Sequence, residues 1–145
     1  MANPMYGSNR DDNKIDALAA AYDSSGVLLS NRIKVAEVAL ADADSAGGVF
    51  SWTNPEGVSL IIDKIILDVT TESTGACTLD VGGSATVASA DNMLDGQSVA
   101  AAGTFASGAV ANKIAAGKYV TASKATGAAA DLAGTAYIFY YTLAA

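Results

Sequence analysis

The sequence predicts an all-β protein, a jelly-roll-like β-sandwich preceded by an N-terminal arm. From residue 31 onward, short stretches of alternating or continuous apolar residues are separated by turns rich in Gly, Asn and Pro, and about seven or eight such stretches follow one another. No repeat of about 20–50 residues is present, which argues against solenoids and propellers. We therefore expect an arm over 1–30 and a single β-sandwich domain over 31–145, with a jelly roll as the favoured version.

The arm differs from the rest of the chain because its apolar residues recur at helical spacing. Asp11 or Asp12 can cap a short helix over about 11–22. A short helix with one narrow apolar stripe is only marginally stable alone, so the arm is expected to pack on its own β-domain or on another subunit. The arm residues expected at a partner interface are Met5, Tyr6, Ile15, Leu18, Tyr22, Leu28 and Leu29.

The first strands of the β-domain are expected at 31–40 and within 47–57. The second of these stretches ends in a turn at Asn54, Pro55 and Gly57. Phe50 and Trp52 share one face of this strand, and we expect both in the core.

The stretch 58–70 is the strongest strand, and it is too long and too apolar for a sheet edge. Its apolar residues change phase after Ile62, because Val58, Leu60 and Ile62 have one parity and Ile65, Leu67 and Val69 have the other. Such a change indicates a β-bulge or a strand that passes from one sheet to the other.

The remaining strands are expected at 75–83, 98–105, 117–124 and 135–145. In the first, Cys77, Leu79 and Val81 alternate with polar residues and should face the core, which makes Cys77 a small core residue. The last is rich in aromatic residues on both faces and is expected at the centre of a sheet.

The segment TLDVGGSATVASADNMLDG, residues 78–96, is the strongest candidate for a ligand loop. Asp91, Asn92 and Asp95 lack the alternate spacing and the terminal Glu of an EF-hand calcium loop. Gly82 and Gly83 follow a strand but precede no expected helix, so a phosphate cradle is also disfavoured. We interpret 82–96 as a long inter-strand loop, exposed or at a contact, whose Asp and Asn side chains bond the backbone.

Enzymatic chemistry has no convincing residue set. The chain contains no histidine, which is the commonest general base near neutral pH, and no G-x-S-x-G elbow occurs. Two carboxylates can act as an acid–base pair, and the candidate pairs are Asp63 with Asp68 and Asp80 with Asp91. Nothing in the sequence distinguishes these pairs, so we expect no enzyme, no metal site and no cofactor.

Composition excludes several other classes of partner. The chain has 145 residues, a length typical of one domain, and carries a net charge of −7 with 8 scattered basic residues. Nucleic-acid binding is therefore disfavoured. The longest apolar run is interrupted by charges and is far shorter than the ~20 residues of a membrane-spanning helix. No secretory signal is visible at the N-terminus, which favours synthesis and folding in the cytoplasm.

Parts of the β-domain resemble head decoration (cement) proteins of tailed bacteriophages. The resemblance covers about 47–145 and is carried by LDVTT (67–71), TGACTLDVG (74–82), SADNMLDG (89–96), GKYVTAS (117–123) and a tyrosine-rich last strand. It implies a β-sandwich or jelly roll that sits on the outer surface of the capsid as a homodimer or homotrimer. It also implies that the major capsid protein is its partner and that the chain is made in the cytoplasm of a bacterial host.

Two other functions fit the same pattern. A tail-fibre or adhesin module would use the jelly roll to bind carbohydrate, through exposed aromatic residues and Asp or Asn clusters around one groove. A self-assembling shell or tail subunit would polymerise without a preformed particle.

Overall fold

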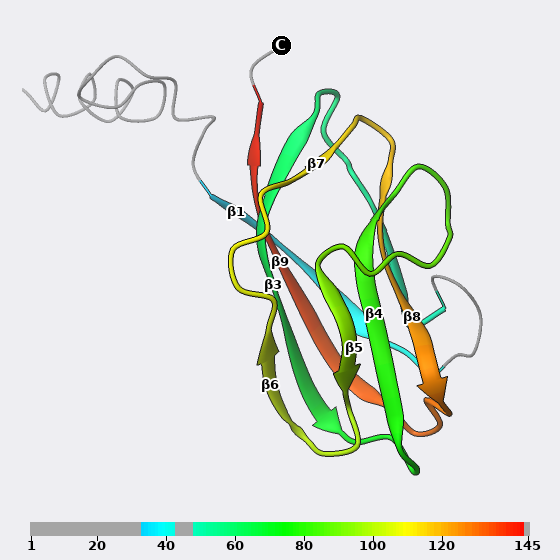
Figure 1. Cartoon of the computed structure of the whole chain (residues 1–145). Helices are drawn as coiled ribbons and strands as arrows, with labels where there is room; N and C mark the ends of the chain where they lie inside the picture. The colour runs from blue at the N-terminus through cyan, green and yellow to red at the C-terminus, as the bar shows by residue number, and fades with distance from the viewer. Residues whose placement is uncertain (1–32, 43–47, 144–145) are drawn as a thin grey trace, which may run out of the picture. The chain divides into compact units, whose positions relative to one another are not determined.

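A computed structural model describes residues 33–42 and 48–143 (Figure 1). The described chain forms strands and connecting loops, with no helix among these residues. The expected helix at 11–22 and all the arm residues named above lie outside the described residues. The strands are β1 (Lys34–Leu40), β2 (Phe50–Thr53), β3 (Leu60–Thr71), β4 (Cys77–Ser84), β5 (Leu94–Ser98), β6 (Gly103–Ala106), β7 (Asn112–Ile114), β8 (Tyr119–Gly127) and β9 (Ala133–Thr142).

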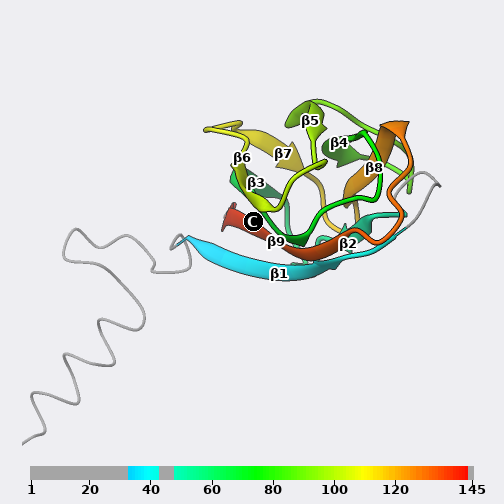
Figure 2. The same ribbon diagram turned by 90° about the horizontal axis from the view of Figure 1, so that it is seen from below.

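The strands form two antiparallel sheets that face each other, as Figure 2 shows from one end. One sheet has the order β1-β9-β3-β6, with β7 also paired to β3, and the other has the order β2-β8-β4-β5. When β6 and β7 are counted as one interrupted strand, these are the two four-stranded sheets of a jelly roll. The expectation of an all-β, jelly-roll-like sandwich is therefore confirmed.

The core lies between the sheets and is built from the inward parity of each strand. Its largest fully buried side chains include Leu60, Ile62, Ile65 and Leu67, all from β3, and Ile138 from β9. Both strands are central, since β9 lies between β1 and β3 and β3 lies between β9 and β6, as expected for the two most apolar stretches.

The change of phase in β3 is a β-bulge. The pairing with β9 shifts between Ile62 and Lys64, so Asp63 is the extra residue and the strand stays in one sheet. Side chains alternate between the two faces of a strand, so the inserted residue places Ile65, Leu67 and Val69 on the same inward face as Leu60 and Ile62. Without it, every later side chain of β3 would point to the wrong side of the sheet.

Two expectations about strands were wrong. The stretch 98–105 is not one strand, because β5 ends at Ser98 and β6 begins at Gly103 in the other sheet. The residues between them are the crossover, where Val99 is fully buried and its amide donates to the Cys77 carbonyl. In addition, β5 occupies part of the segment predicted to be loop, because backbone pairing with β4 forms this strand without an alternating apolar pattern.

Candidate functional site: the aromatic face

The outer surface of the β1-β9-β3-β6 sheet carries a group of partly exposed aromatic and aliphatic residues. We call this surface the aromatic face. It consists of Val35 and Glu37 of β1, Tyr137, Phe139 and Tyr141 of β9, and Ile61, Lys64, Ile66 and Asp68 of β3.

Strand register places these side chains in rows across the sheet. Phe139 lies opposite Val35 on one side and Lys64 on the other, and Tyr137 lies in the same way between Glu37 and Ile66. The row beyond Phe139 joins Tyr141, Ile61 and Lys113, and the row beyond Tyr137 joins Thr135, Asp68 and Thr104.

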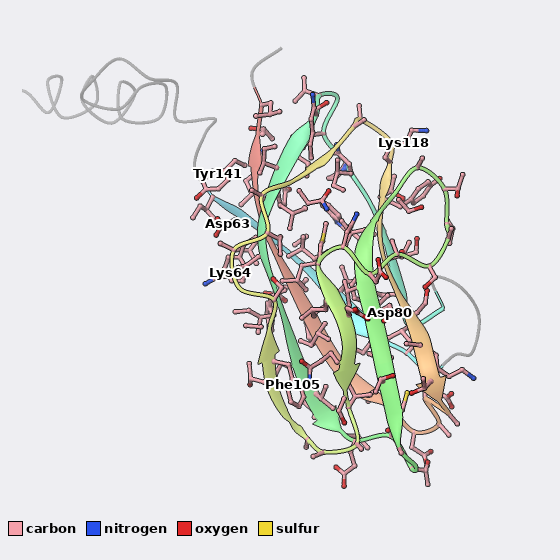
Figure 3. All side chains as sticks on the ribbon, viewed as in Figure 1. Asp63, Lys64, Asp80, Phe105, Lys118 and Tyr141 are labelled. Atoms are coloured by element: carbon pink, nitrogen blue, oxygen red, sulfur yellow. The ribbon has the colours of Figure 1, made fainter. Side chains whose placement is uncertain are left out.

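The bulge at Asp63 determines what lies beside Phe139. Because Asp63 is the inserted residue, Lys64 takes the outward position opposite Phe139, and its Nζ lies 5.0 Å from the ring centroid. This distance is typical of a cation–π contact. Figure 3 shows Asp63, Lys64 and Tyr141 on one side of the sandwich and Asp80 and Lys118 on the opposite side.

Charge is distributed unevenly along the aromatic face. The two rows nearest the end of β9 contain the basic residues Lys113 and Lys64, and the two rows nearest its start contain the acidic residues Glu37 and Asp68. The aromatic side chains of β9 lie within these rows, Tyr141 in the row of Lys113, Phe139 in that of Lys64 and Tyr137 in that of Glu37. The acidic bulge residue Asp63 adjoins Lys64.

The outer surface of the other sheet is covered in part by the chain itself. The segment 85–93 folds over β4 and β8, where Thr121 Oγ1 donates to the Ala88 carbonyl at 2.7 Å and Thr121 is fully buried. Gly82 lies under this segment, since a Cβ there would come within 2.6 Å of Asn92 Oδ1. On the inward side, a Cβ at Gly83 would collide with Ile114 Cδ1. The paired glycines thus permit close packing on both faces of β4.

Asn92 of the 82–96 segment bonds the backbone, as expected, and so does Asp80, which precedes the segment. The Gly83 amide donates to Asn92 Oδ1 at 2.8 Å, and the Gly96 amide donates to Asp80 Oδ1 at 2.9 Å. Gly96 has a positive φ of 63°, a conformation that glycine adopts readily. Among the described residues, no three His, Cys, Asp or Glu side chains are grouped as metal ligands. The prediction that 82–96 is entirely loop was wrong at its ends, where β4 extends to Ser84 and β5 begins at Leu94.

The first candidate carboxylate pair is too far apart for acid–base catalysis. Asp63 and Asp68 lie five positions apart on β3, which corresponds to about 15 Å along a strand. Paired glycosidase carboxyl groups are roughly 5–9.5 Å apart. In the second pair, Asp80 bonds the Gly96 amide, and Asp91 is exposed in the covering segment.

The residues expected in the core are found there. Cys77 is buried, with 1% of its surface exposed, and Phe50 is 4% exposed. Trp52 packs against the core on the same side of β2, with its ring centroid 5.2 Å from that of Tyr140. These three side chains therefore stabilise the sandwich.

A polar cluster that the sequence did not reveal lies where β1 and β9 meet the β2–β3 turn. Lys34 Nζ lies 2.7 Å from Glu56 Oε1, and the Tyr140 hydroxyl donates to the same oxygen at 3.2 Å. The hydrogen bond from Lys34 lowers the pKa of Glu56, and burial together with the Glu56 charge raises the pKa of Tyr140. Sequence separation conceals this cluster, since Glu56 and Tyr140 are 84 residues apart.

Asn54 fixes the position of the same turn. Its Nδ2 donates to the carbonyls of Val58, Ile114 and Ala115 at 3.0–3.2 Å, and its Oδ1 accepts from the Glu56 amide at 2.9 Å. Asn54 was expected only as a turn residue. It also joins the β2–β3 turn to the end of β7.

The predicted partner-interface residues of the arm are not placed by the structure. Met5, Tyr6, Ile15, Leu18, Tyr22, Leu28 and Leu29 all lie outside the described residues. No helix in the described part of the chain has the length and hydropathy needed to cross a membrane.

No protein-family model matches the chain, and no curated protein matches it. Among solved structures, a chain of the "Cyanophage Pam1 capsid asymmetric unit" is similar over 78% of this chain and 84% of that chain, with 17% identity and a TM-score of 0.48. A likeness of this strength establishes neither a shared fold nor a shared function.

Proposed function

We propose that this chain is a virion structural protein, a decoration or cement protein that binds the assembled bacteriophage head and stabilises contacts between major capsid subunits. The observation that carries the proposal is a jelly-roll sandwich with a broad, partly exposed aromatic surface on one sheet. The resemblance of 47–145 to decoration proteins supports it from the sequence. A protein that acts by contact needs an extended surface of this kind.

The proposed mechanism is mechanical and involves no catalysis. Binding to the assembled shell in preference to loose subunits stabilises the assembly by mass action. The arm, with its apolar residues from Met5 to Leu29, supplies one contact with the shell, in addition to that of the aromatic face. Several weak contacts repeated over a closed oligomer give an avidity well above that of any single contact.

The test is to mix purified protein with heads assembled without it and to measure occupancy by electron microscopy. We expect the protein to bind preformed heads and not isolated capsid subunits. Equal binding to free subunits, or no binding to heads, would exclude a decoration role. A variant lacking residues 1–30 should keep the β-domain folded, as shown by its melting curve, and should occupy fewer sites. Equal occupancy would exclude the arm as the contact.

The two rival functions predict different experimental results. Binding of the purified protein to a glycan array would favour a carbohydrate-binding module, and polymerisation detected by light scattering would favour a shell or tail subunit. The contact of Lys64 with the Phe139 ring argues against a sugar platform, because it covers the central aromatic residue. A turnover activity that is lost on substitution of one carboxylate would contradict the whole proposal.

A further inference from the structure

We propose that the Asp95–Gly96 peptide is a site of spontaneous backbone isomerisation, and that a hydrogen bond from the Gly96 amide to Asp80 restrains this reaction in the folded chain. The reaction is succinimide formation followed by hydrolysis to isoaspartate, and water is its only co-reactant. This inference concerns β4 and β5 and does not depend on attachment to a phage head.

Asp95 has the neighbour that this chemistry favours. It is the only Asp or Asn of the 145-residue chain that directly precedes a glycine. Because glycine has no Cβ, its backbone nitrogen can approach the preceding side chain with little steric hindrance. Both Asp95 and Gly96 are exposed in β5, so water can reach the reacting atoms. Local sequence and exposure therefore both favour reaction at this peptide.

The reaction exchanges one bond at each step. The Gly96 nitrogen bonds to the side-chain carboxyl carbon of Asp95, and the hydroxyl group of that carboxyl leaves with the amide proton as one water molecule. Water then adds to one of the two carbonyls of the five-membered ring. Cleavage of the newly formed bond restores aspartate, whereas cleavage of the original peptide bond gives isoaspartate, in which the chain passes through the former side chain. The mass of the final product equals that of the starting chain.

Asp80 restrains the nitrogen that has to react. The pairing of β4 with β5 shifts between Leu79 and Val81, so Asp80 faces two residues of β5, Asp95 and Gly96, at a bulge. The Gly96 amide donates to Asp80 Oδ1 at 2.9 Å. To attack, the nitrogen has to lose this proton and turn from Asp80 toward the side chain of Asp95. A hydrogen bond to an ionised acceptor is among the stronger ones in proteins, and it opposes both changes.

The same bulge determines what isomerisation would do to the sheet. Isoaspartate adds one carbon atom to the backbone, and at residue 95 this atom would lengthen β5 where it already has one residue more than β4. The strand β5 lies at the edge of its sheet, beside β4 alone (Figure 1). We therefore expect isomerisation to separate β5 from β4 near Gly96 while the central strands stay paired.

Incubation of the full-length chain near neutral pH and at physiological temperature tests the proposal. Endoproteinase Asp-N cleaves before aspartate and not before isoaspartate, so digestion followed by mass spectrometry measures the fraction converted at residue 95. The folded wild-type chain should convert about tenfold or more slowly than the same chain unfolded in urea, because the bond to a charged acceptor has to break first.

Three variants of β4 identify the restraining group. Asp80→Ala removes the acceptor and should raise the rate of conversion in the folded chain about tenfold. Asp80→Asn keeps an oxygen acceptor and should stay within about threefold of the wild-type rate. Thr78→Ala is the matched control, because Thr78 lies two positions before Asp80 on the same side of β4 and bonds Thr126 of β8. It should leave the rate unchanged.

Melting curves of the variants separate loss of the bond from loss of folding. No conversion at residue 95 even in urea, or equal rates in the folded and unfolded wild-type chain, would overturn the proposal. An unchanged rate in Asp80→Ala, or a rate in Asp80→Asn or Thr78→Ala as high as in Asp80→Ala, would also overturn it. None of these measurements uses phage heads, so failure here is distinct from failure of the decoration function.

Discussion

Asn92 and Gly83 form a two-way contact: the Gly83 amide donates to Asn92 Oδ1 at 2.8 Å, and Asn92 Nδ2 donates to the Gly83 carbonyl at 3.4 Å. This contact fastens the 85–93 segment to β4 at the position where two glycines leave room for it. The residues that suggest a ligand loop in the sequence are therefore used for packing the chain on its own sheet.

Gly82→Ala should destabilise the fold by about 1–3 kcal/mol, because the added Cβ would lie 2.6 Å from Asn92 Oδ1 and 2.7 Å from the Ala90 carbonyl carbon. Urea denaturation followed by tryptophan fluorescence measures the change. Gly57→Ala is the control, since a Cβ there meets no atom within 4 Å, and it should change stability by less than about 0.5 kcal/mol. Equal changes of stability in Gly82→Ala and Gly57→Ala would show that the 85–93 segment is not tightly packed against Gly82.

Asn54→Ala should cost about 3 kcal/mol, because it removes the donor to three carbonyls at a site where Asn54 is only 3% exposed. Asn92→Ala, which removes an exposed side chain with two bonds, should cost about 1 kcal/mol. Thermal and chemical denaturation of both variants give the comparison. A smaller loss of stability in Asn54→Ala than in Asn92→Ala would contradict the stabilising role assigned to the buried Asn54 side chain.

The Lys34–Glu56–Tyr140 cluster predicts how stability varies with pH. The pKa of Glu56 is lowered from 4.5 in the folded state, so the stabilisation is present above that value and is lost as the pH falls through the folded pKa. The pair is partly exposed, so the loss should be below about 1 kcal/mol. The pKa of Tyr140 is raised from 10.0, so the unfolded chain ionises first and stability also falls above pH 10.0.

Lys34→Met should flatten the acid limb of this profile, because it removes the cation that holds the carboxylate ionised. Lys118→Met removes the same charge from an exposed side chain that does not contribute to the pKa shift of Glu56, and it should leave the acid limb as in the wild type. Denaturation midpoints measured at a series of pH values provide the data. An unchanged acid limb in Lys34→Met would show that another group titrates there.

Addition of a chelator should leave the melting temperature unchanged. In the 78–96 segment, Asn92 Oδ1 and Asp80 Oδ1 are already bonded to backbone amides. Among the described residues, no three His, Cys, Asp or Glu side chains are grouped as metal ligands. Differential scanning calorimetry with and without EDTA measures the melting temperature in the two conditions. A fall of several degrees, restored by calcium, would instead support a cation at Asp91 and Asp95.

Sequence patterns predicted the strands whose side chains alternate or run continuously apolar. The strongest of these, β3, was identified together with its change of phase, because a β-strand has a strict period of two and one inserted residue must appear as a shift. The short β5 and β7 were missed, since their pairing is made by backbone groups that leave no trace in the order of side chains.

Periodicity by itself determined that β9 has two apolar faces and belongs at the centre of a sheet. The tertiary structure decided which face turns inward. Ile138 and Tyr140 point into the core, whereas Tyr137, Phe139 and Tyr141 lie on the outer side of the sheet. The neighbours of these side chains come from strands far away in the sequence, so the rows of the aromatic face and the Lys34–Glu56–Tyr140 cluster exist only after the sheets form. Local sequence encodes the period of each strand, whereas the partner of each side chain depends on contacts that are non-local.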